Sequence, residues 1–309
     1  MVNIKRKVIQ IANSTQLISL PRKWSQKYGI KKGDEIEVEE NGSKITVRTD
    51  KSFSVEKAEL NIDNLDPMVL RSVTALYKRG VDEIKITFNK PELIKSIQDA
   101  IGKEAVGYEI TEQGKDYCII KHVSGELEDF EPVLRRTFLL LISMANESLE
   151  SIKRNDFDNL KNVAFLEEAN NRFTTNCRRF LNKKGYKDSR KLGPLYYIIE
   201  EIENIADQYK YLCYHIYKYR NKKIKLNKEI LEIFQETNEM LNTFYELFYK
   251  FDQDKLVAIG KQRNQLVDRF LRFMEKSFNP IENLTIHQLL TIMQKTFCLV
   301  GPYMVINYD

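Results

Sequence analysis

Three carboxylates recur at helical spacing in the C-terminal half of the chain. Glu200, Glu203 and Asp207 are three and four residues apart, which places them on one stripe of a helix. The preceding helical segment contains Glu167, with Asn171 four residues further on. Carboxylates on facing helices are the ligands that hold cations in helical bundles. The pattern therefore predicts a metal site at Glu167, Glu203 and Asp207 for a divalent or ferric ion.

The same acidic stripe has a plainer interpretation as an exposed or salt-bridged face. The preceding helical segment offers Arg172, Arg178 and Arg179 as ion-pair partners. A metal-dependent hydrolase that uses Glu203 and Asp207 is a third interpretation. However, no motif in the chain brings a base and a nucleophile together. We therefore expect that the chain is not an enzyme.

Basic residues gather at the N-terminal end of the chain. Residues 1–51 contain eleven Lys and Arg against six Asp and Glu, whereas the remaining residues contain equal numbers of each. A local excess of positive charge is typical of a segment that meets a polyanion. Lys and Arg bind DNA phosphates and release counterions, and a helix start favours phosphate as well. The predicted DNA contacts are Lys5, Arg6, Lys7, Arg22, Lys23 and Lys27.

Residues 1–50 are expected to form a small β-rich domain. Asn41-Gly42 lies between two runs that alternate apolar and polar residues, which is a strong hairpin signal. Pro21 suits the start of a short helix over 22–28, and Gly29 ends it. A unit of about fifty residues is marginally stable alone. We therefore expect a second copy of the chain to complete its core.

The rest of the chain is expected to form two further domains. Residues 51–125 alternate predicted strands and helices, which is typical of a small α/β layer. Residues 126–309 are helical throughout, and their six helices fall into two runs of three, about 126–221 and 222–309. The predicted fold class is a multidomain α+β protein, mostly α, with a C-terminal bundle of two three-helix repeats.

Cysteine usage and hydropathy indicate a cytoplasmic protein. The four cysteines are far apart and form no CxxC pair, which is typical of reduced, mostly buried thiols. The N-terminus has no apolar signal-peptide region. Leu289 to Ile306 is apolar, but Lys295 and Gly301-Pro302 interrupt it, so we interpret it as a core helix. We expect the protein not to be embedded in a membrane.

Two further stretches each have a plain and a functional interpretation. Tyr209 to Tyr217 is rich in aromatic residues, which could stack on bases, but their spread around a helix favours core packing. Residues 218–228 hold six basic residues at the join between the two helix runs. They form either a solvated linker or a second phosphate-binding surface.

The N-terminal motifs follow one another in a recognisable order over residues 3–50. Arg6-Lys7-Val8 begins a basic strand, and Leu20-Pro21-Arg22-Lys23 starts a helix. A Gly29-Ile30 turn, a Gly33-Asp34 turn and a closing hairpin follow. This order resembles the AbrB/SpoVT family of swapped-hairpin DNA-binding domains. The resemblance implies an intertwined homodimer whose strands form the DNA-binding face, although Ser25 and Gln26 stand where family members often carry basic residues.

The helical region has a resemblance of its own. Glu203-Asn204-Ile205-Ala206-Asp207 is similar to the Glu-x-x-x-Asp motif of the PhoU family of phosphate-uptake regulators, whose helices bind metal clusters. The second repeat departs from the motif at Asn264 and Asp268. An AbrB-like head joined to a PhoU-like body resembles an archaeal type of phosphate uptake regulator.

These resemblances imply two functions that stay open. The first is a DNA-binding transcriptional regulator linked to phosphate uptake and homeostasis. The second is a PhoU-like adaptor that acts on a phosphate transporter or signalling protein, with the N-terminal domain used only for dimerisation.

Overall fold

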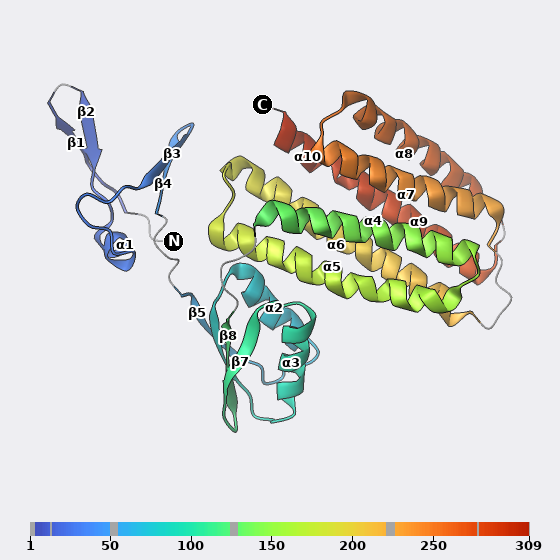
Figure 1. The fold of residues 1–309 in the computed structure, drawn as a ribbon, viewed down its shortest axis with the longest axis horizontal. Coiled ribbons are helices and arrows are strands. Elements are labelled where there is room, and N and C mark those ends of the chain that lie inside the picture. Colours follow the sequence, from blue (N-terminus) through green and yellow to red (C-terminus); the bar gives the residue numbers. More distant parts are fainter. Residues whose placement is uncertain are drawn as a thin grey trace. The chain divides into compact units, whose positions relative to one another are not determined.

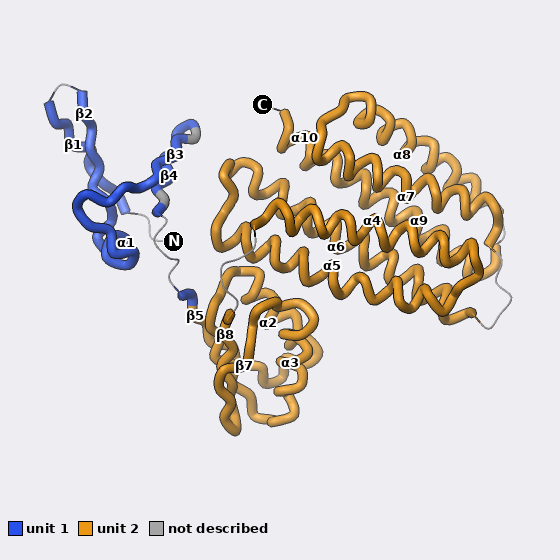
Figure 2. The backbone as a smooth tube through the Cα atoms, in the orientation of Figure 1, with its two compact units in different colours: residues 1–56 blue, residues 57–309 orange. Residues whose placement is uncertain are grey.

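The computed structural model describes residues 4–12, 14–49, 55–123, 129–220, 226–276 and 278–308. Contacts between residues divide the chain into two units, Met1–Glu56 (unit 1) and Lys57–Asp309 (unit 2), which are shown in different colours in Figure 2. Unit 1 holds small β-hairpins, and unit 2 holds a mixed α/β sheet followed by a helical region (Figure 1). The protein is therefore a mostly helical α+β protein, as the sequence predicts at that level.

Unit 1 consists of two antiparallel hairpins with a short helix between them. The first hairpin pairs β1 (Val8–Ile11) with β2 (Thr15–Ile18), and the second pairs β3 (Glu37–Asn41) with β4 (Lys44–Arg48). Helix α1 (Arg22–Lys27) lies between them in the chain. The hairpin around Asn41-Gly42 and the short helix after Pro21 are both confirmed.

The first part of unit 2 is a four-stranded sheet. Its strands are β5 (Lys57–Asn61), β6 (Glu83–Thr87), β7 (Tyr108–Gln113) and β8 (Tyr117–His122), in the spatial order β5-β6-β8-β7. Strands β5 and β6 are parallel, and the segment that connects them contains a helix, as parallel neighbours require. The pairs β6–β8 and β8–β7 are antiparallel.

Two helices cover one face of this sheet. They are α2 (Val69–Arg79) and α3 (Leu93–Lys103). Val73 and Tyr77 lie one turn apart on α2 and are fully buried against strand residues such as Ile84. Gly80 ends α2 in a left-handed conformation, with φ of 99°. The result is a two-layer α/β domain with a core of its own.

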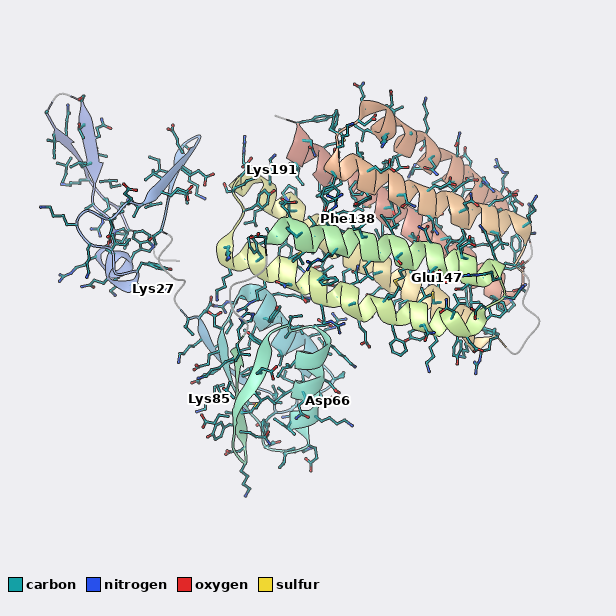
Figure 3. The ribbon with its side chains drawn as sticks, viewed as in Figure 1. Lys27, Asp66, Lys85, Phe138, Glu147 and Lys191 are labelled. Carbon is teal, nitrogen blue, oxygen red and sulfur yellow. The ribbon has the colours of Figure 1, made fainter. Side chains whose placement is uncertain are left out.

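The helical region follows directly. Its described helices are α4 (Phe130–Lys153), α5 (Phe157–Lys184), α6 (Ser189–Lys218), α7 (Lys228–Tyr249), α8 (Gln253–Met274), α9 (Pro280–Cys298) and α10 (Val300–Asn307). Their apolar faces share one continuous core, which includes Phe138 of α4 (Figure 3). The expected helices are present with small differences at their ends, and the duplication of three-helix repeats stays a prediction.

The last expected helix is divided in two. The sequence predicts a single helix over 284–308, but α9 ends at Cys298 and α10 begins at Val300. Pro302 has no backbone N–H to donate to the carbonyl of Cys298, so the regular ladder cannot continue there. Leu299 joins the two helices and is fully buried.

One stretch, Pro280–Asn307, is long and apolar enough by length and composition to cross a membrane, a test that core helices of soluble proteins also pass. Within it, Leu289, Ile292 and Met293 are fully buried and belong to the core of the helical region. This agrees with the interpretation of Leu289 to Ile306 as a core helix.

The cysteines are free thiols, of which Cys118, Cys177 and Cys213 are buried and Cys298 is exposed. Burial raises the pKa of Cys118 to about 11, which keeps that thiol protonated at neutral pH. The expectation of mostly buried thiols is confirmed.

Candidate nucleic-acid interface

The three basic residues nearest the N-terminus lie outside the strand expected to carry them. The sequence predicts that Lys5, Arg6 and Lys7 belong to a basic strand, but β1 begins at Val8. The register pairs Val8 with Ile18, the last residue of β2. The ladder within one chain ends at this pair. The basic segment is therefore an exposed extension of β1.

The other three predicted DNA contacts lie on α1. Arg22 and Lys23 form its first turn, which contains no acidic residue, and Lys27 is its last residue (Figure 3). The ammonium of Lys27 lies 5.5 Å from the ring centroid of Tyr28. All six predicted contacts are exposed, and none forms an ion pair with a residue that the structure describes.

Local hydrogen bonds fix the path of the chain around α1. The hydroxyl of Ser25 donates to the carbonyl of Pro21 at 3.3 Å. Gly29 follows with φ of 58°, a conformation that glycine adopts without steric cost. The Asp34 carboxylate then accepts from the backbone N–H of Lys31 at 2.6 Å. The helix start and the two turns that the sequence motifs predict are therefore present in the structure, in the same order.

The apolar side chains of unit 1 lack cover. Among the residues between 4 and 49 whose side chains the structure describes, none is buried, and Ile45 is 67% exposed. Strand alternation puts Ile9, Ile11 and Leu17 on one face of the first hairpin, because Ile9 pairs with Leu17. In the second hairpin Val38 shares a face with Ile45. Each hairpin thus presents one predominantly apolar face that this single chain leaves in solvent.

Two of the predicted metal ligands meet at a lysine. The ammonium of Lys210 on α6 lies 2.9 Å from a carboxylate oxygen of Glu167 on α5 and 2.5 Å from one of Asp207. Burial raises the pKa of Glu167, and Lys210 opposes that change only in part. Burial alone would lower the pKa of Lys210, but its bonds to Asp207 and Glu167 outweigh burial and raise it. The cation that bridges Glu167 and Asp207 in this structure is therefore the ammonium group of Lys210.

The third predicted ligand is held by an arginine. Arg178 is 1% exposed and pairs with both Glu203 and Glu200 on α6. The hydroxyl of Thr174 also donates to Glu203, at 2.5 Å. The salt-bridged interpretation of the acidic stripe is confirmed for these residues.

The expected metal site is not assembled in this structure. Its three carboxylates divide between Lys210 and Arg178. Among the residues that the structure describes, no group of three or more His, Cys, Asp or Glu side chains could hold a metal ion. A metal ion would have to displace two neutralising cations, so these residues as arranged do not fit it.

Arg179 has a role that the sequence did not indicate. Its guanidinium donates to the carbonyls of Tyr77 and Val81, at 2.9 and 2.7 Å, and pairs with Asp82 at 2.8 Å. It also lies 4.8 Å from the Tyr77 ring centroid. These contacts join α5 to α2 and to the loop between α2 and β6, within unit 2. The sequence signal for this contact was the adjacent pair Arg178-Arg179 in a core helix. Adjacent residues on a helix point in different directions, so the two arginines meet different neighbours.

The two remaining stretches have different outcomes. Tyr209 is fully buried and donates its hydroxyl to Asn238 at 2.7 Å, so it packs in the core, although Tyr211 and Tyr214 are exposed. The basic stretch 218–228 lies partly outside the described residues, at 221–225.

Comparison with known protein families gives a match for the N-terminal segment. Residues 9–54 match the family described as antidote-toxin recognition MazE, bacterial antitoxin. No curated protein and no solved structure matches the chain, and the helical region has no match that supports the PhoU resemblance. The chain is thus similar over residues 9–54 to the MazE antitoxin family, and the expected AbrB-like N-terminal domain is confirmed at that level.

Proposed function

We propose that this protein is a DNA-binding transcriptional regulator that acts as a homodimer through unit 1. The observation that carries the proposal is the combination found in the segment similar to MazE. This segment exposes an apolar face on each hairpin, and six exposed cations lie within or beside it. In a swapped-hairpin dimer the two copies cover each other's apolar faces, and the basic residues of both chains gather on one surface.

The cations then supply the affinity for DNA. Contacts to phosphate dominate such binding and make it depend steeply on salt, and they position the protein without reading the sequence. Arg22 and Lys23 are the best placed, because α1 contains no acidic residue in its first turn.

In this proposal the helical region receives the signal that controls the regulator. We also propose a link to phosphate uptake and homeostasis, which rests on the similarity of Glu203-Asn204-Ile205-Ala206-Asp207 to the PhoU motif. We further propose that the protein acts in the cytoplasm and is not an enzyme.

A second candidate is an adaptor that acts on a phosphate transporter or signalling protein. The exposed apolar faces of unit 1 favour dimerisation whether or not DNA is bound. In this case unit 1 only dimerises the chain.

The test measures binding of the full-length protein to a random-sequence DNA duplex. Fluorescence anisotropy gives the affinity at about 50 and 200 mM salt. We expect binding to weaken steeply between these concentrations. The double variant Arg22→Glu/Lys23→Glu should lose at least about tenfold in affinity at low salt, because four favourable contacts per dimer become repulsive.

The matched control is Lys90→Glu/Lys95→Glu, which reverses two exposed charges in unit 2. Equal loss in both double variants would show that net charge, and not the surface of unit 1, controls binding. An intact dimer that binds no DNA at low salt would favour the adaptor.

A further inference from the structure

The first hairpin of unit 1 is a two-stranded ribbon without charged side chains. Strands β1 and β2 pair with each other and with no further strand that the structure describes (Figure 1). Residues 8–21 contain no Asp, Glu, Lys, Arg or His, although the basic residues 5–7 precede them and Arg22-Lys23 follows. In the sequence, the hairpin therefore lies between two groups of cations and carries none itself.

The two faces of this ribbon differ in polarity. Ile9, Ile11 and Leu17 lie on the face that we assign to the partner copy. The register pairs Gln10 directly with Gln16, so both amides lie on the opposite face. Each amide has hydrogen-bond donors and an acceptor, and burying these groups without partners costs free energy. In the proposed dimer, the face with the two glutamines is therefore the one that stays in solvent.

Both glutamines are open to contact with a ligand. Gln10 and Gln16 are exposed, and neither side chain forms a hydrogen bond with a residue that the structure describes. The next pair on the same face is Val8 with Ile18, which are 63% and 62% exposed. This face thus combines two amides with two aliphatic side chains.

These side chains match the edges of base pairs better than they match phosphates. The major groove of DNA admits a two-stranded β-ribbon, and a glutamine amide forms two hydrogen bonds with N6 and N7 of adenine. Aliphatic groups pack against the thymine methyl group in the same groove. Opposite side chains on a ribbon are about 4.5–5.5 Å apart at Cβ, and successive phosphates of one strand rise by about 3.4 Å, so the two amides can reach neighbouring base pairs.

We propose that this face of the first hairpin reads A·T base pairs in the major groove, with Gln10 and Gln16 as the residues that contact adenine. The inference rests on the proposed DNA binding by unit 1 and divides the roles within it. The cations on either side of the hairpin hold the phosphates, which carry no sequence information directly, and the hairpin supplies the preference for sequence.

The test compares three duplexes of equal length, made of alternating A·T, alternating G·C and alternating I·C base pairs. An I·C pair presents the atoms of G·C in the major groove and those of A·T in the minor groove, so it separates the two grooves. Fluorescence anisotropy with the full-length protein should give an affinity about tenfold higher for the A·T duplex than for either of the others.

Two double variants locate the contact. Gln10→Ala/Gln16→Ala should remove the preference and keep the affinity for the G·C duplex within about twofold, because the cations are unchanged. Gln10→Arg/Gln16→Arg should reverse the preference toward the G·C and I·C duplexes, because arginine pairs with O6 and N7 of guanine and inosine has the same two atoms. Sedimentation equilibrium should show that both variants remain dimers.

The matched control is Gln98→Ala/Gln265→Ala, which truncates two exposed glutamines of unit 2 and should leave the preference unchanged. Arg22→Glu/Lys23→Glu should lower the affinity for all three duplexes by a similar factor, since it removes contacts to phosphate.

Equal affinity for the three duplexes would overturn the inference and leave the proposed function intact. Equal affinity for the A·T and I·C duplexes would place the contact in the minor groove, and a preference that survives Gln10→Ala/Gln16→Ala would place it on other residues. Either result overturns the inference alone. If the natural chain binds none of the duplexes at low salt, the proposed function fails together with the inference.

Discussion

Residues 57–309 enclose two clusters of buried apolar side chains, one beneath the sheet and one within the helical region. The described residues between 4 and 49 enclose none, although Val, Ile and Leu also occupy their strands. Residue type therefore does not explain the difference. Two hairpins and a helix of six residues offer too few segments to cover an apolar face. Unit 2 encloses apolar cores within one chain, which unit 1 does not, and this difference is why we propose a second copy for unit 1.

The cations of the two units differ in the same way. In unit 1 the predicted DNA contacts Lys5, Arg6 and Arg22 are exposed, whereas in unit 2 Arg178 and Arg179 are buried among oxygen acceptors. A buried cation is committed to the fold, and an exposed one stays available to a polyanion. Charge alone therefore does not distinguish a cation that stabilises the fold from one that is open to solvent, and burial is needed as well.

The largest effect is expected from a charge on the apolar face of the first hairpin. Ile9→Asp should raise the Kd of the dimer by at least about 100-fold, because each copy loses roughly 1.5–3 kcal/mol of apolar burial and must also bury a carboxylate. Sedimentation equilibrium measures the change, and circular dichroism should show that the helices of unit 2 remain.

The matched control for this prediction is Gln10→Asp. Gln10 is the neighbouring residue and points to the opposite face of the same strand. If Gln10→Asp disrupts the dimer and Ile9→Asp does not, the face assigned to the partner copy is the wrong one.

The next largest effect concerns the buried cations of unit 2. Arg179→Met should lower the free energy of unfolding by about 2 kcal/mol, because two carbonyls and the Asp82 carboxylate each lose one buried donor, while Lys183 still pairs with Asp82. Urea denaturation measures it. Arg190→Met breaks an exposed ion pair with Asp188 and should cost no more than about 1 kcal/mol. Comparable losses in the two variants would contradict the difference drawn between buried and exposed cations.

The smallest effect is a pH dependence at Glu167. Its pKa in the folded state is raised above the ordinary 4.5. A raised pKa contributes stability that is fully present below the ordinary value and is lost as the pH rises through the folded-state value. Glu167→Gln cannot titrate. The unfolding free energy of the natural chain minus that of the variant should therefore fall as the pH rises from about 4.

Urea titrations at a series of pH values measure this difference. Glu150→Gln, at an exposed position on α4, should show no such trend. A difference that grows with pH would mean that Lys210 lowers the pKa of Glu167 more than burial raises it, and would contradict this prediction.

Local signals in the sequence predicted most elements of the fold. The Asn41-Gly42 hairpin, the helix after Pro21 and the helices of the C-terminal region follow from turn residues and apolar spacing. Gly301-Pro302 also interrupts the apolar run in the sequence. Only the structure shows that the helix ends at Cys298 and that a new one begins at Val300. The order of the strands in the mixed sheet could not be read from the sequence, because strand pairing is not local.

The candidate sites show the same difference between local signals and contacts that are distant in the sequence. The sequence by itself determined that an excess of basic residues lies in the first 51 residues, and that Glu200, Glu203 and Asp207 share a helical stripe, because both depend on nearby residues. Only the tertiary structure decided that Arg178 and Lys210 neutralise that stripe. Those pairings depend on how α5 and α6 pack, and packing is fixed by the whole core rather than by the spacing of any one segment.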